Sequence, residues 1–228
     1  MNTNMNTNMN TTTIYICICI AVIVLILLYY YYYYYLPAQN NIGKYQIKIL
    51  TDEIHMNNEY DNFFLIKNLI PNRDTLYVPK LGYGLSFIWD MYIPNNGGND
   101  KWQHSYNILK PILTMNDSPQ ISYHPKKNYL SIILKYRNNP FYAQYTEIKY
   151  TKIKQQKWSK YILIINGRNI QLYIDNQIVL SQNLPSLPVI YDINSEIILG
   201  KKNNNFLGKI RNLILIPYPI SANEIQSL

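Results

Sequence analysis

The first 43 residues contain no Asp, Glu, Lys or Arg, and the first charged side chain is Lys44. The whole formal net charge of +8 therefore belongs to the part of the chain from Lys44 onward. Such a balance favours anionic partners, among them acidic glycans, lipid headgroups and nucleic acid. The alternative is a cationic surface that only keeps the protein in solution.

Cysteine is nearly absent. Cys17 and Cys19 are the only two, and both lie in an apolar run near the N-terminus. The rest of the chain therefore has no disulfide framework and no cysteine cluster that could bind zinc.

The N-terminal segment is low in complexity and then strongly apolar. Residues 1–12 repeat Asn, Thr and Met, which cannot form a core, and predict a disordered tail. Residues 14–28 are uncharged, and seven tyrosines extend the run to Tyr35. A helix over residues 13–36 would be about 36 Å long, enough to cross a membrane with tilt. We therefore expect a single-pass transmembrane anchor there, followed by a linker over residues 37–43.

Other interpretations of this segment stay open. A cleaved signal peptide would need a basic start and small residues at the cleavage site, and a buried core helix would be shorter or amphipathic. The side of the membrane is uncertain as well. Lys44 and Lys48 favour a cytosolic sandwich, whereas the glycosylation acceptor at Asn116 favours the opposite side, such as a viral envelope or an inner membrane surface.

Alternating patterns predict many short strands. The apolar residues of segment 85–93 fall on one side of an extended chain: Leu85, Phe87, Trp89, Met91 and Ile93. Ser86, Asp90 and Tyr92 fall on the other side, where Ile88 is the exception. Similar strands are expected at 44–50, 63–69, 107–114, 120–124, 129–136, 144–150, 159–165, 169–174, 196–199 and 208–216. Turn residues separate them, which predicts an all-β, two-sheet antiparallel sandwich over residues 44–228.

The C-terminal half carries an ordered set of motifs. Trp158 opens an apolar strand that turns at Asn166-Gly167, and the next strand ends at Tyr173-Ile174-Asp175-Asn176. Leu199-Gly200, Phe206-Leu207-Gly208-Lys209-Ile210 and a capping box from Ser221 to Glu224 follow, the last predicting a short C-terminal helix. Trp158 is expected to fill the core, and Asp175-Asn176 to form a left-handed turn.

This order closely resembles the laminin-G-like, concanavalin A-like lectin/glucanase domains, over about Lys44 to Leu228. The resemblance implies a jelly-roll sandwich. The sequence departs from the family pattern at Asn176, where Gly is usual. Asn tolerates the left-handed conformation that the same turn needs. The family includes glycan-binding, adhesive and hydrolytic members, so the fold does not decide the function. A residue usage rich in Asn, Ile, Lys and Tyr is typical of an AT-rich genome, such as that of a large DNA virus or of certain protists.

Evidence for catalysis is weak. The hydrolytic branch uses two carboxylates on one strand, and the nearest match, Glu59 and Asp61, has Phe64 in place of the second catalytic Glu. The three histidines are scattered, and the glycines at 82 and 84 precede a strand, which argues against a nucleotide site. We therefore expect no enzyme activity and no catalytic residues.

Two stretches are candidate binding sites. The loop 95–104 carries polar and aromatic side chains that could hold a sugar ring: Asn99, Asp100, Trp102 and His104. Asp100 could also contribute to a calcium site, which makes calcium a possible cofactor. The second stretch is basic and would attract acidic polysaccharide: Lys149, Lys152, Lys154, Lys157 and Lys160. The alternatives are a loop that covers the sandwich edge and lysines that protect a sheet edge from pairing.

These features predict a membrane-anchored, non-catalytic recognition or adhesion protein that binds glycan or protein. No nucleic-acid partner is expected. One alternative is a structural membrane or virion-envelope protein without glycan binding, and another is a glycoside hydrolase.

Overall fold

The computed structural model describes residues 11–30, 46–56, 62–65, 84–95, 107–136, 144–189, 195–201, 204 and 206–227. The chain divides into two compact units, residues 1–44 and residues 45–228. In the first unit, the helix α1 covers Thr11–Tyr30. The second unit contains every described strand and the short helix α4, Ala222–Gln226.

The prediction of a membrane-spanning helix over residues 13–36 is wrong. No helix among the described residues is both long and apolar enough to cross a membrane. The uniformly apolar part, residues 14–28, is about 22 Å long at 1.5 Å per residue, below the roughly 30 Å of a hydrocarbon layer. The prediction reached a sufficient length by counting the tyrosine run and Leu36, whereas the described helix α1 covers Thr11–Tyr30. The single-pass membrane localisation, which depended on that helix, is therefore wrong as well. The predicted linker at 37–43 lies outside the described residues.

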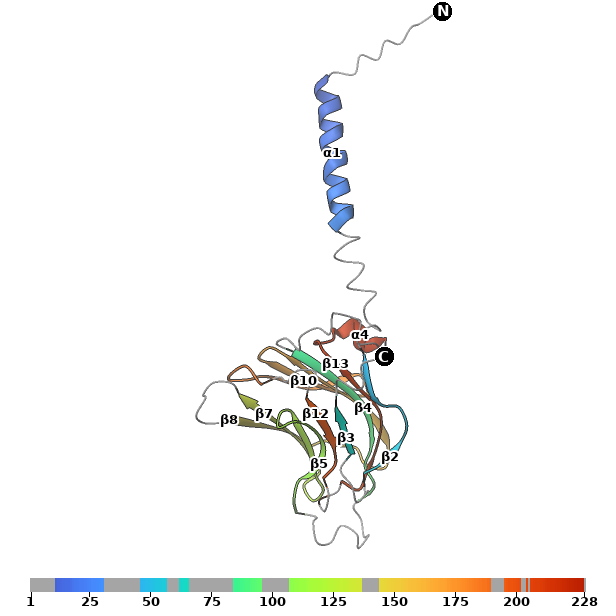
Figure 1. Ribbon diagram of the computed structural model, residues 1–228, viewed down its shortest axis with the longest axis vertical. Helices are drawn as coiled ribbons and strands as arrows, with labels where there is room; N and C mark the ends of the chain where they lie inside the picture. Colours follow the sequence, from blue (N-terminus) through green and yellow to red (C-terminus); the bar gives the residue numbers. More distant parts are fainter. Residues whose placement is uncertain are drawn as a thin grey trace, which may run out of the picture. The chain divides into compact units, whose positions relative to one another are not determined.

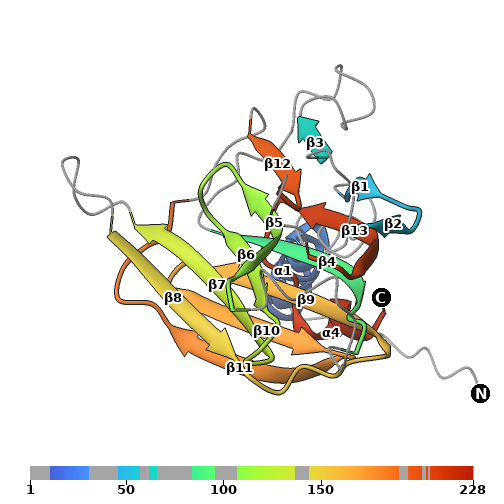
Figure 2. The ribbon, with the colours of Figure 1, turned by 90° about the horizontal axis from the view of Figure 1, so that it is seen from below.

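The second unit consists of two antiparallel sheets that pack face to face (Figures 1 and 2). Sheet A contains, in spatial order, β1 (Ile47–Leu50), β13 (Lys209–Ile216), β4 (Gly84–Tyr92), β9 (Trp158–Asn166), β10 (Asn169–Ile174) and β11 (Gln177–Asn183), and β2 (Ile54–His55) pairs with β13. Sheet B contains β3 (Asn62–Leu65), β12 (Glu196–Leu199), β5 (Lys110–Met115), β6 (Gln120–His124), β7 (Tyr129–Tyr136) and β8 (Gln144–Tyr150). The predicted all-β, two-sheet antiparallel architecture is confirmed.

The core lies between the sheets and takes the side chains that the alternating pattern assigned to it. Leu85, Phe87, Trp89 and Met91 of β4 are all buried in it. Trp89 stacks on Tyr161 of β9 with ring centroids 5.4 Å apart. Fully burying one such side chain contributes about 1.5–3 kcal/mol, so this double layer accounts for most of the stabilisation of the unit.

A second apolar cluster covers part of the opposite, outer face of sheet A. Its buried members are isoleucines from three strands, the segment before α4 and α4 itself: Ile88, Ile162, Ile164, Ile216, Ile220 and Ile225. Ile88 therefore broke the alternation of β4 because it packs in this outer layer. The Ser86 hydroxyl links the layer to the sheet, since it accepts a bond from the Ile220 N–H (3.0 Å) and donates to the Tyr218 carbonyl (2.9 Å).

The helix α4 begins as the sequence predicted. The Ser221 side chain accepts from the Glu224 N–H, and the Glu224 carboxylate accepts from the Ser221 N–H at 2.6 Å. This capping box fixes the helix so that Ile225 lies against the isoleucine layer. The isoleucine layer and α4 thus cover one part of the outer face of sheet A.

Candidate functional site on the outer face of sheet A

Beside the short helix α4, side chains on the outer face of sheet A form three cross-strand rows, and the first of these shares Ile88 and Ile162 with the isoleucine layer. The isoleucine row runs from Lys48 on β1 through Ile214 and Ile88 to Ile162 on β9, each paired with the next. Alternate residues of a strand point to the same face, so the next row lies two residues away along β4 and β9, and three residues away along β13, which is bulged there. The rows therefore follow directly from the strand register.

The second row is charged. It consists of Arg211 on β13, Asp90 on β4 and Lys160 on β9, which are paired in register. The Asp90 carboxylate accepts from the Arg211 Nε (3.3 Å) and from the Asn212 side-chain amide (2.8 Å). Asn212 reaches Asp90 because β13 bulges there, with Asn212 in the left-handed region at φ 51°.

The third row is aromatic. Trp158 on β9 pairs with Tyr92 on β4, and their rings lie 5.8 Å apart. The Arg211 guanidinium lies 4.2 Å from the centre of the Trp158 ring, a cation–π contact. Arg211 therefore joins the aromatic row to the carboxylate of Asp90.

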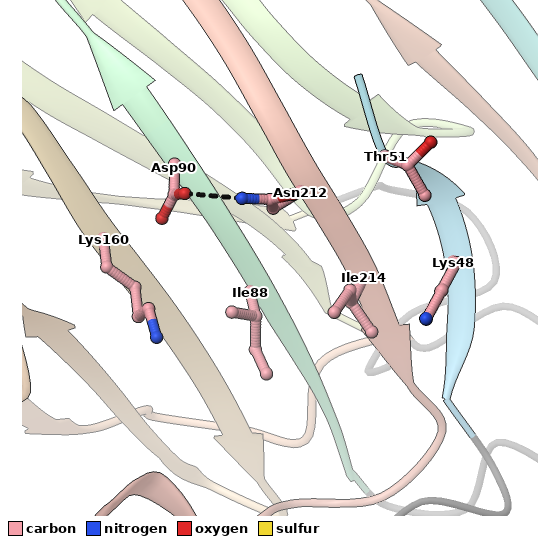
Figure 3. Close-up of a pocket in the computed structure, with 7 residues that line it drawn as sticks. All are labelled: Lys48, Thr51, Ile88, Asp90, Lys160, Asn212 and Ile214. Carbon is pink, nitrogen blue, oxygen red and sulfur yellow. Dashed lines mark hydrogen bonds between the residues drawn. The ribbon is translucent and has the colours of Figure 1, made fainter. Parts of the chain in front are cut away.

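A cavity of about 240 Å³ opens where the isoleucine and charged rows meet (Figure 3). Its lining comes from β1, β4, β9, β13 and the residue that follows β1: Lys48, Thr51, Ile88, Asp90, Lys160, Asn212 and Ile214. Ile88 and Ile214 form an apolar floor between the two lysines, and Asp90 with Asn212 forms a polar wall. The arrangement can bind a ligand that carries both an apolar group and negative charge.

The structure corrects one core prediction. Trp158 is half-buried and lies on the outer face, whereas Ser159 and Tyr161 point into the core. Strand β9 has isoleucines on both faces, so its pattern could not show which side Trp158 occupies. Sequence reasoning therefore missed the site that Trp158 borders.

The predicted basic stretch is distributed over both sheets. Lys149 belongs to β8 of sheet B, pairs with Glu147 at 2.8 Å and lies over the Tyr129 ring. The hydrogen bond that the Lys149 ammonium donates to Glu147 raises the pKa of Lys149. Lys160 belongs to β9 and lines the cavity of sheet A. These two lysines therefore do not share a face.

The remaining lysines of that stretch lie in the connection between β8 and β9. Lys152 is exposed, and the ammonium groups of Lys154 and Lys157 lie 3.9 and 3.4 Å from the same Asp175 oxygen. Asp175 also accepts from the Lys160 backbone N–H at 3.1 Å. The family-like Asp175 thus holds a turn and a basic segment together, and its left-handed φ of 51° matches the predicted turn.

The candidate sugar-binding residues belong to the loop 95–104, of which the structure describes only residue 95. Asn99, Asp100, Trp102 and His104 lie outside the described residues, as do Glu59 and Asp61. Among the residues that the structure does describe, no three His, Cys, Asp or Glu side chains come together as metal ligands.

A set of polar and aromatic side chains lies on the outer face of sheet B. The Ser131 hydroxyl donates to Glu147 at 2.6 Å, and the His124 ring lies 5.0 Å from Tyr129. Burial would raise the pKa of Glu147, but bonds from Lys149 and Ser131 lower it overall. Burial, assisted by nearby Lys127, lowers the pKa of His124. Ser131, Glu147 and Lys149 interact with one another, and His124 packs against Tyr129, which is typical of a structural network.

Neither protein-family models nor characterised proteins match the sequence. Solved structures do resemble the fold. One is a mutant designated HCR/D, with a TM-score of 0.54 and 14% identity over 77% of this chain and 42% of that chain. Another is the botulinum neurotoxin serotype G binding domain, with a TM-score of 0.51 and 17% identity over 80% of this chain and 41% of that chain.

The chain thus spans about two fifths of the length of each of these structures. At such low identity the likeness establishes the fold alone. The protein is a two-sheet antiparallel β-sandwich whose fold is similar to that of these structures.

Proposed function

We propose that this protein is a non-catalytic recognition module that binds a glycan or protein ligand on the outer face of sheet A. The observation that carries the proposal is the cavity between Lys48 and Lys160, with its apolar floor and its polar wall. Recognition sites combine an apolar surface with a few fixed polar groups in this way. The rigid strands of sheet A hold those groups in place.

The fold supports a role in recognition. The neurotoxin domain with a similar fold is itself described as a binding domain. The strand order and the ordered C-terminal motifs support assignment to the concanavalin A-like jelly-roll type, to which the resemblance to laminin-G-like domains also points. An internal structural role without any ligand is the competing function.

The basic stretch adds a second element to the proposal. Its lysines would attract acidic polysaccharide over a wider area and in a salt-dependent way. They are Lys149, Lys152, Lys154, Lys157 and Lys160.

An array that displays both glycans and peptides tests the proposal with the full chain. We expect specific signals that disappear in the double variant Lys48→Gln, Lys160→Gln. The matched control is Lys126→Gln with Lys127→Gln, which removes the same charge from the exposed turn between β6 and β7 and should bind normally. A silent array would favour the structural role, and signals that the cavity variant leaves unchanged would place the binding site elsewhere on the molecule.

A further inference from the structure

The floor of the cavity lies between two cations. Figure 3 shows the amino group of Lys160, the side chains of Ile88 and Ile214, and the amino group of Lys48 in one line across the strands. The line crosses β9, β4, β13 and β1, which are successive neighbours in sheet A. Neighbouring strands are about 4.8 Å apart, so the lysines stand on backbones roughly 14 Å apart.

The charge that this line presents is positive. Asp90 is the only acid among the lining residues, and Arg211 and Asn212 already donate to it. Lys48 and Lys160, on either side of the apolar floor, are the basic side chains of the lining, so the lining carries two positive charges and one negative charge. Charge complementarity calls for a ligand with an acidic group at each end and an apolar group in the middle.

The aromatic row argues for a protein ligand over a sugar. Sugar rings stack on open aromatic faces, but Arg211 lies 4.2 Å above the Trp158 ring and Tyr92 packs beside it at 5.8 Å. The floor itself is aliphatic, because it consists of Ile88 and Ile214. Such a floor suits a Leu, Ile or Val side chain.

We propose that the cavity binds an extended peptide segment with the pattern acidic–any–apolar–any–acidic. Residues i, i+2 and i+4 of an extended chain point to the same side, and four residues span about 13 Å. That length is close to the roughly 14 Å between the strands that carry Lys48 and Lys160, so each acid reaches a lysine while the middle side chain packs against Ile214 and the edge of Ile88. This inference rests on the proposed function, because it assumes that the cavity is the ligand site.

Titration of the full chain with short capped peptides tests the inference. The parent peptide has seven residues, with Glu at positions two and six, Ile at position four and Ser elsewhere. We expect replacement of either Glu by Gln to weaken binding about two- to fivefold, as for exposed ion pairs. Replacement of the Ile by Ser should weaken binding about tenfold. A peptide with its two Glu residues moved to positions three and five should bind as weakly as a peptide in which one Glu has been replaced by Gln.

Protein variants identify the site. Lys48→Gln or Lys160→Gln should lower the affinity for the parent peptide by the same two- to fivefold. For such a variant, replacing one Glu of the peptide by Gln should cause no further loss of affinity. Lys126→Gln with Lys127→Gln should change it much less. An equal loss in that control would mean general attraction between opposite charges and would overturn the inference.

Glycan controls separate the inference from the proposed function. Tight binding of a heparin-derived hexasaccharide that requires Lys48 and Lys160, without peptide binding, would overturn the peptide inference but keep the cavity as the recognition site. Binding of neither probe, together with a silent array, would overturn both.

Discussion

Trp158 illustrates how a residue can be conspicuous in a sequence and still lie outside the core. Its ring is half-buried, covered by Arg211 and flanked by Tyr92. We expect Trp158→Ala to lower the free energy of unfolding by about 1–2 kcal/mol, since only part of the ring leaves water. Fully buried Trp89 is the control, and Trp89→Ala should cost about 3–5 kcal/mol. Urea unfolding of both variants measures the difference. Equal losses of unfolding free energy would show that Trp158 is a core residue.

His124 gives the protein a defined response to acid. Burial lowers the pKa of His124 in the folded state, below the value of about 6.5 of an unfolded chain. As the pH falls from about 7 through this window, the unfolded state takes up the proton first, so stability decreases. His124→Phe should make the free energy of unfolding less dependent on pH between about 7 and 5. An unchanged slope would show that His124 ionises equally in both states.

The single-residue details of the site were beyond prediction for a physical reason. Sequence alternation identified the inward face of β4 correctly because its outward positions are mostly polar. In β9, by contrast, Ile162 and Ile164 cover the outer face while Leu163 and Ile165 fill the core. Because both faces of β9 carry apolar residues, no alternation of polar and apolar residues distinguishes one face from the other. The Asn212 bulge and its bond to Asp90 arise from pairing between distant strands, which no local pattern encodes.

At the scale of elements, the short helix α4 closes one end of the outer face. Its capping box satisfies the first backbone N–H groups, and Ile225 anchors it on the isoleucine layer. We expect Ser221→Ala to destabilise the protein by about 1 kcal/mol, the usual cost of losing such a cap. Gln226→Ala changes an exposed position of the same helix and serves as the control. Thermal unfolding that shows the same loss for both variants would argue against the capping role.

Most strands could be predicted, and the exceptions have causes. Strands β6, β7, β8, β10 and β12 coincide with their predicted segments, because each shows alternation or ends at a turn residue. Strand β11 was missed because it forms the edge of sheet A, and neither of its faces is buried. Strand β2 has only two residues, too few to show a period.

At the scale of the whole molecule, residues 45–228 should be a self-sufficient unit. They contain both sheets and the complete core between them. We expect a chain that begins at Tyr45 to unfold cooperatively in urea at nearly the midpoint of the full chain, with a strand-dominated circular dichroism spectrum. A broad transition, or a large drop in the midpoint, would show that residues 1–44 contribute to the stability of the sandwich.

The apolar N-terminal run shows the limit of composition as a guide. An uncharged stretch followed by tyrosines suggested a spanning helix, but the inference depended on where the helix ends. Helix ends are set by capping and by the local chain, and composition does not fix them.

The central claim is that ligands bind on the outer face of sheet A, and isoleucine methyl NMR tests it most directly. The δ1 methyl groups of Ile88 and Ile214 line the cavity, whereas those of Ile132 and Ile197 lie in the core between the sheets. On titration with the acidic peptide, or with any ligand from the array, we predict shifts concentrated at Ile88 and Ile214. Unchanged signals from these two residues, with shifts elsewhere in the sandwich, would contradict the proposed site.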